Sequence, residues 1–91
     1  MTTNEMYVFI GEDSIFPAGI FTTLENAEKW IEKYSLTGIL NKYPIDIGIY
    51  DWAIKEDFFT IKNEYQKEPR FIQRFTCASM EHFHYENGKL M

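Results

Sequence analysis

The chain has 91 residues, of which 45% are hydrophobic and 25% charged, with a net charge of −5 at neutral pH. This length predicts a single domain over residues 1–91, because so short a chain cannot divide its apolar side chains between two cores. The composition excludes a disordered chain. Because the sequence shows no basic leader and no long apolar segment, we expect neither secretion nor a membrane span. A single cysteine allows no internal disulfide, which favours a reducing cytoplasm.

The charge is unevenly distributed along the chain. Residues 1–59 hold ten acidic and four basic residues, whereas residues 60–75 carry a net charge of +2. An acidic body repels phosphate backbones, so we expect no nucleic-acid partner. The same charge attracts basic proteins and accelerates encounter with them.

Three β-strands are predicted in the first half of the chain. The β-rich run at residues 6–10 predicts a strand that stops at a segment of turn composition. A second strand is predicted over residues 15–22, bent or bulged at Pro17 and Gly19 because proline cannot donate to a ladder. Residues 38–43 predict a third strand, which ends before a proline.

A long helix is predicted directly after the second strand. Thr22 or Thr23 can cap it, and Thr22 with Glu25 has the spacing of a capping box. Glu25 and Lys29 have the spacing of an ion pair on the exposed side. The apolar side chains recur at the helical period and form one stripe: Leu24, Ala27, Trp30, Ile31 and Tyr34.

A shorter helix is predicted from about residue 48 to residue 56. Asp46 could cap it, and Ile49, Trp52 and Ala53 would face inward. The polar residues 57–69 predict a loop.

Two further elements are predicted near the C-terminus. Pro69 begins a short helical turn, and residues 80–86 form the last strand, closed by the turn residues Asn87 and Gly88. Together the elements predict an α+β fold in the order β-β-α-β-α-…-β, with a mostly antiparallel sheet of three to four strands and helices packed on it. The short helical turn is expected to direct Phe71, Ile72 and Phe75 inward and Arg70 and Arg74 outward.

Several short motifs resemble a family of small bacterial proteins classed as a domain of unknown function. The motifs are FPAGIF, TLE, AE and WI within residues 16–31, YPIDIGIYDWA at residues 43–53, and the later pairs FF and RF, so the resemblance covers most of the chain. It supports a β-β-α-β layout and implies no activity. In such a family we expect glycine before the paired phenylalanines as a left-handed helix end, and Asp57 stands there instead. The chain is also similar to immunity proteins of bacterial toxin systems, in size and charge only.

The stretch EHFHYENG at residues 81–88 is the strongest candidate for chemistry. Residues two apart on a strand share a face, so His82, His84 and Glu86 would point the same way and could bind a metal. The competing interpretation is a half-buried strand with Phe83 and Tyr85 packed inward and the histidines in solvent. We favour the second interpretation, because no other part of the chain has ligand spacing.

No other pattern indicates catalysis. Cys77 could pair with a histidine, yet its small neighbours suit a buried structural cysteine. Asp46 and Asp51 resemble a carboxylate pair, but capping and exposure explain them. The sequence has no nucleophile-elbow, phosphate-loop or dinucleotide motif. We therefore expect no enzymatic activity and no cofactor.

Aromatic residues are unusually numerous: six Tyr, eight Phe and two Trp. Because a domain of this size buries only about 60–65% of its unfolded surface, some rings should lie at the surface, unless all of them fit a tightly packed core. The candidates are Tyr43, Tyr50, Tyr65 and Tyr85.

The predicted function is a non-catalytic module that binds a protein, in its sharpest form an immunity-type inhibitor of a basic toxin domain. The alternatives are a metal- or small-molecule-binding domain that uses His82 and His84, and a homo-oligomer that pairs through an open sheet edge. The predicted partner-binding residues are Tyr43, Asp46, Tyr50, Asp51, Glu56 and Asp57.

Overall fold

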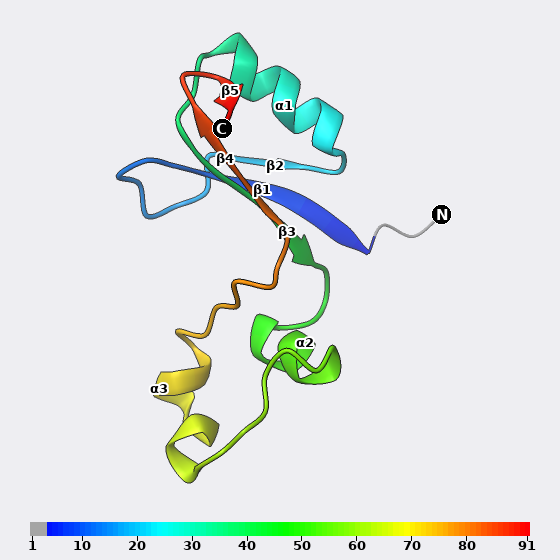
Figure 1. Cartoon of the computed structure of the whole chain (residues 1–91), viewed down its shortest axis with the longest axis vertical. Helices are drawn as coiled ribbons and strands as arrows, with labels where there is room; N and C mark the ends of the chain where they lie inside the picture. The colour runs from blue at the N-terminus through cyan, green and yellow to red at the C-terminus, as the bar shows by residue number, and fades with distance from the viewer. Residues whose placement is uncertain (1–3) are drawn as a thin grey trace. The chain divides into compact units, whose positions relative to one another are not determined.

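The computed structural model describes residues 4–91, which form two compact units (Figure 1). We call them the sheet unit, residues 4–45 with 80–91, and the aromatic unit, residues 46–79. The single domain predicted for residues 1–91 stays a prediction. Within residues 4–91, no helix has both the length and the apolar character needed to cross a bilayer.

The sheet unit contains five antiparallel strands in the order β2-β1-β3-β4-β5. The central strands β1 (Glu5–Gly11) and β3 (Gly38–Pro44) pair along their whole lengths. Strand β2 (Gly19–Phe21) lies at one edge, and β4 (His82–Glu86) pairs with β3 on the other side and carries the edge strand β5 (Lys89–Leu90). The predicted α+β class is confirmed, with one strand more than expected.

The additional strand belongs to a C-terminal hairpin. Asn87 and Gly88 connect β4 to β5 as a two-residue turn, and their φ angles are 50° and 85°. A type I′ turn requires a positive φ at both positions, and Asn-Gly is its favoured pair. The turn was predicted, but a strand of two residues is too short to show an alternating pattern.

The second strand is shorter than predicted. Only Gly19–Phe21 pairs with β1, and Ile15 and Phe16 are 85% and 78% exposed. Pro17 explains the difference, because it has no amide hydrogen to give to a ladder.

Helix α1 (Leu24–Lys33) covers one face of the sheet (Figure 1). Ala27 and Ile31 are fully buried against Phe9 of β1 and Leu40 of β3. The predicted apolar stripe is therefore confirmed at its centre, while Tyr34 at its end is 56% exposed.

The predicted cap of α1 was only partly right. Thr23 is the N-cap, and its hydroxyl accepts a hydrogen bond from the amide of Asn26 at 3.2 Å. The capping box of Thr22 and Glu25 does not form, because the helix begins one residue later than that spacing requires. The predicted ion pair does form, with Lys29 Nζ 2.9 Å from Glu25 Oε1.

Lys42 links three strands of the sheet unit through its side chain and its backbone. Its ammonium lies 3.1 Å from the carboxylate of Glu5 on β1 and 3.4 Å from that of Glu81, next to β4. The hydrogen bond to Glu5, helped by Glu81, raises the pKa of Lys42 above its ordinary value of 10.5, against the smaller opposing effect of burial.

The aromatic unit contains α2 (Ile49–Lys55), the 3₁₀ turn η1 (Glu64–Lys67) and α3 (Pro69–Ile72). Both helices lie where the sequence predicted them, and Pro69 occupies the first turn of α3. The predicted cap of α2 is wrong: Gly48 is its N-cap, without a side-chain hydrogen bond, and Asp46 has a left-handed φ of 64°. The shorter helix, α2, was predicted to pack on the sheet together with the long helix α1; it belongs to the aromatic unit.

Candidate functional site

A cluster of rings positions the side chains of the aromatic unit. Tyr50 of α2 packs against Phe59, Phe71 and Phe75, with ring centroids 5.5–6.3 Å apart. Phe59 and Phe75 approach most closely, at 4.9 Å. These rings fix α2 and α3 relative to each other although both helices are short.

Four exposed carboxylates surround α2, and we call them the acidic surface: Asp46, Asp51, Glu56 and Asp57. Within residues 4–91, none of the four is within 4.0 Å of a basic side chain. Lys55 is the only base between residues 46 and 57. The acidic surface therefore keeps its full negative charge available to a partner.

The C-terminal end of α2 holds two of these carboxylates. Phe58 donates its amide to the carbonyl of Ala53 at 2.8 Å, and Asp57 donates to Ile54 at 3.1 Å, the hydrogen bonds of a Schellman motif. Asp57 occupies the left-handed position of this motif with a φ of 67°. Glycine suits that position better, and the helix dipole disfavours the acids Glu56 and Asp57 at this end. Local stability therefore does not explain either acid.

An aromatic pair lies beside the acidic surface. The rings of Trp52 and Phe58 are 5.4 Å apart, and Phe58 is 52% exposed. Glu56 is one helical turn from Trp52, so the two side chains leave the same side of α2. The sequence predicted Trp52 as an inward residue; the structure places it only half-buried, with its ring tilted by 45° against the exposed ring of Phe58.

Two of the four tyrosines predicted at the surface, Tyr50 and Tyr85, are buried, so that prediction was wrong for both; the inward position of Tyr85 confirms the interpretation of β4 as a half-buried strand. Each hydroxyl finds an acceptor inside its own unit: Tyr50 donates to the carbonyl of Gln66 at 2.9 Å, and Tyr85 to Glu28 Oε2 at 3.0 Å. Burial, followed by the contact with Glu28, raises the pKa of Tyr85 above its ordinary value of 10.0.

The other two tyrosines lie in different units. Tyr65 is 56% exposed, as predicted. Tyr43 is half-buried on β3 and belongs to the sheet unit, whereas the other five predicted partner-binding residues belong to the aromatic unit. Of those five, only Tyr50 is buried and cannot offer its ring to a partner.

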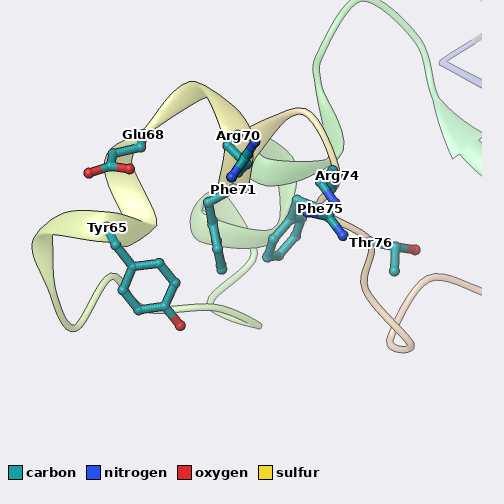
Figure 2. Close-up of a pocket in the computed structure, with 7 residues that line it drawn as sticks. All are labelled: Tyr65, Glu68, Arg70, Phe71, Arg74, Phe75 and Thr76. Carbon is teal, nitrogen blue, oxygen red and sulfur yellow. The ribbon is translucent and has the colours of Figure 1, made fainter.

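A pocket of about 480 Å³ opens next to α3 (Figure 2). Figure 2 shows the rings of Phe71, Phe75 and Tyr65 projecting to one side of the ribbon. Both arginines of the chain line the pocket, and within residues 4–91 neither is in an ion pair. We call it the arginine pocket, and its lining residues are Tyr65, Glu68, Arg70, Phe71, Arg74, Phe75 and Thr76.

The sequence pointed to the parts of this pocket without identifying the site. Arg70 and Arg74 were predicted outward, and the structure exposes both. Phe71, Ile72 and Phe75 were predicted inward: the two phenylalanines are half-buried in the ring cluster, but Ile72 is exposed, so the prediction was wrong for Ile72. The spacing in RFIQRF, where each arginine precedes a phenylalanine and the pair repeats after one helical turn, is the signal that could have found the pocket.

The two histidines are exposed on β4, with ring centroids 5.4 Å apart. His82 Nδ1 lies 2.8 Å from the carbonyl oxygen of Met80. Among residues 4–91, no group of three or more His, Cys, Asp or Glu side chains is arranged to hold a metal ion. Glu86 therefore does not complete a three-ligand site with His82 and His84.

Cys77 is half-buried in the aromatic unit, where the sequence predicted a buried side chain. Both histidines belong to the sheet unit.

Comparison with known proteins gives one match. A family model described as a domain of unknown function (DUF7710) matches residues 6–91, which include parts of both units. No curated protein and no solved structure gives a significant match. The expected resemblance to a domain of unknown function is confirmed, and the description names no activity or partner.

Proposed function

The chain belongs to the DUF7710 family of domains of unknown function, and on that premise we propose that it is a non-catalytic module whose acidic surface binds a basic protein. The observation that carries the proposal is Asp57. This acid keeps a left-handed φ of 67° at the end of a helix, where glycine would be less strained. Ser35 at the end of α1 has a similar strain, but Asp57 adds a negative charge that the helix dipole disfavours, and a contact with a basic molecule would explain that charge.

The charge of the acidic surface supports a basic partner. Its four carboxylates have no basic neighbour to neutralise them among the described residues, and the chain as a whole carries −5. Complementary charge accelerates encounter and selects against acidic competitors. Each carboxylate would gain a new ion pair without breaking an old one.

The ring pair of Trp52 and Phe58 supplies the apolar part of the contact. Aromatic side chains ringed by polar groups are the usual anchors of protein interfaces. Phe58 is 52% exposed and its ring packs at a tilt of 45° against Trp52, which holds the ring in place before binding. Such preorganisation lowers the entropy that binding would otherwise cost.

In its sharpest form the proposal identifies the partner as a basic toxin domain of a bacterial cell, whose active site the chain covers in the cytoplasm. The edge strands β2 and β5 have three and two residues and offer few free backbone groups, which makes pairing of sheet edges the weaker alternative. A single free cysteine is consistent with a cytoplasmic protein.

Co-expression with the products of the adjacent genes tests the proposal. We expect one basic product to co-purify, and its affinity to fall as the salt concentration rises. The triple variant Asp51→Asn, Glu56→Gln, Asp57→Asn should raise the Kd about 10- to 100-fold, as expected for about 0.5–1 kcal/mol per interfacial charge. Calorimetry at two salt concentrations measures both effects.

A matched control removes the same charge from the sheet unit. Glu12→Gln, Glu25→Gln, Glu32→Gln also neutralises three exposed acids and should change the Kd less than threefold. If both triple variants raise the Kd equally, net charge alone determines the affinity. The acidic surface is then not the binding site. Failure of every adjacent gene product to bind would reject the proposal as a whole.

A further inference from the structure

Both arginines of the chain line the same pocket, although the chain is acidic overall. Arg70 lies in α3 and Arg74, four residues later, in the turn that follows it; both are exposed, and no carboxylate within residues 4–91 lies within 4.0 Å of either. A guanidinium presents a planar fork of donors that matches a carboxylate or a phosphate. Two guanidinium groups that line one pocket, neither of them in an ion pair within residues 4–91, can together bind an anion.

The floor of the arginine pocket is aromatic. Phe71 and Phe75 lie one turn apart beside the two arginines, with ring centroids 6.0 Å apart, and Tyr65 meets Phe71 edge to face at 5.5 Å and 88°. Each arginine precedes one of these phenylalanines in the chain, and all four side chains line the pocket (Figure 2). The volume of about 480 Å³ is within the range of small-molecule sites.

We propose that the arginine pocket binds a small molecule that joins a flat aromatic ring to a carboxylate or phosphate group. The ring packs on Phe71 and Phe75, and the anionic group accepts hydrogen bonds from Arg70 and Arg74. The site lies apart from the acidic surface in sequence and uses none of its residues, so this inference does not depend on the proposed protein contact.

The charges favour a small anion over a nucleic-acid strand. Glu68 also lines the pocket, which leaves its lining with two positive charges and one negative. An anion of one or two charges matches this lining, whereas a long polyanion would meet the repulsion of a chain that carries −5. The carboxylate of Glu68 can in addition accept a hydrogen bond from a donor group on the ligand.

The test uses the full chain and four small probes in ¹H–¹⁵N NMR. Because the chain has two arginines, its spectrum holds only two arginine Nε–H signals, which report directly on the pocket. Phenyl phosphate and phenylacetate each combine a ring with an anion, while inorganic phosphate lacks the ring and benzyl alcohol lacks the charge. We expect at least one of the two aromatic anions to shift both arginine signals and the amides of residues 65–76, with a Kd of about 1 mM for so small a fragment.

The two incomplete probes should bind at least tenfold more weakly than that aromatic anion. In the double variant Arg70→Gln, Arg74→Gln, the Kd for that aromatic anion should rise at least tenfold. This Kd is measured from the shifts of the backbone amide signals. Its control, Lys55→Gln with Lys62→Gln, removes the same charge from exposed positions of the same unit and should leave the Kd unchanged.

Three results would overturn the inference. They are the absence of arginine shifts with both aromatic anions at 10-fold the expected Kd, equal binding of inorganic phosphate, and equal loss of binding in the lysine control. The first two use the wild-type chain, so they stand even if the arginine variant folds poorly.

Discussion

In the sheet unit, β1 and β3 pair over seven residues each, whereas in the aromatic unit the longest helix has seven residues and the other two helical segments have four each. Isolated helices shorter than about 12 residues are marginal in water. In the sheet unit, the backbone N–H and C=O groups are therefore paired across long-range β-ladders. In the aromatic unit, packing between side chains must keep the short helices formed.

The side chains of the sheet unit are also more deeply buried than those of the aromatic unit. The sheet unit contains Phe9, Ile31 and Leu40, the largest side chains that are almost completely enclosed. The aromatic unit buries only Tyr50 and Ala53, and its phenylalanines remain half-exposed. Both candidate binding surfaces lie in this less enclosed unit. Binding surfaces are commonly drawn from the parts of a protein with the lowest local stability, because they must remain accessible.

The largest expected effect breaks the ring cluster. Phe59→Ala removes the ring that contacts Tyr50, Phe71 and Phe75, and should destabilise the aromatic unit by about 3 kcal/mol. Native-state hydrogen exchange should then show faster exchange at residues 49–75, while the amides of β1 and β3 keep their protection.

The matched variant in the sheet unit is Leu40→Ala, which empties a fully enclosed position at a similar cost of about 2–5 kcal/mol. It should accelerate exchange in β1, β3 and α1. If each variant instead lowers the protection against hydrogen exchange equally in both units, the two units unfold together. The proposed difference in their stability is then wrong.

The sequence predicted the sheet unit better than the aromatic unit. The helix after Thr23 has a clear helical period because it buries one stripe against the core, and the strands at residues 6–10 and 38–43 are runs rich in β-favouring residues. The hairpin strand β5 and the short β2 were mispredicted, since two or three residues cannot display a period and Pro17 interrupts the ladder.

The candidate sites were harder to predict because exposure is decided by tertiary contacts. Tyr50 and Tyr85 were predicted at the surface on the ground that a phenol tolerates water. Each is buried because a distant residue, Gln66 or Glu28, accepts its hydroxyl. The partners in these two hydrogen bonds are 16 and 57 residues apart in the chain, so the local sequence around each tyrosine does not predict them.

The two buried tyrosines provide a smaller test of the same contrast. Tyr85→Phe removes a hydrogen bond to the carboxylate of Glu28, which should cost about 1.5–3 kcal/mol. Tyr50→Phe removes a bond to the neutral carbonyl of Gln66, which should cost about 0.5–1.5 kcal/mol. Urea unfolding at neutral pH measures both changes.

The hydroxyl of Tyr85 also makes the free energy of unfolding depend on pH. Its pKa is raised in the folded state, so above pH 10 the unfolded chain releases a proton that the folded chain retains. The stability contributed by this hydroxyl is thus complete below about pH 10 and is lost as the pH rises toward the folded-state pKa. Lys42, whose pKa is also raised, acts in the same direction. Stability of the wild type should fall more steeply above pH 10 than that of Tyr85→Phe; equal slopes would show that burial and the contact with Glu28 do not raise the pKa of Tyr85 in solution.

The smallest expected effects compare the ends of α1 and α2. Both helices end in a Schellman motif with a residue other than glycine in the left-handed position, Ser35 at φ 54° and Asp57 at φ 67°. Replacing either by glycine relieves the strain and should stabilise the chain by about 0.5–1 kcal/mol, a little more for Asp57→Gly because it also removes an acid from a helix C-terminus.

The same two variants should differ in partner binding. If Asp57 is retained for a contact with a basic protein, Asp57→Gly should weaken that binding about fivefold while it stabilises the fold, whereas Ser35→Gly should stabilise the fold and leave binding unchanged. Thermal unfolding and calorimetry on both variants separate the two properties. A gain of stability at Asp57 without any loss of affinity would mean that this acid serves neither the fold nor the partner, and the acidic surface would lose the observation on which it chiefly depends.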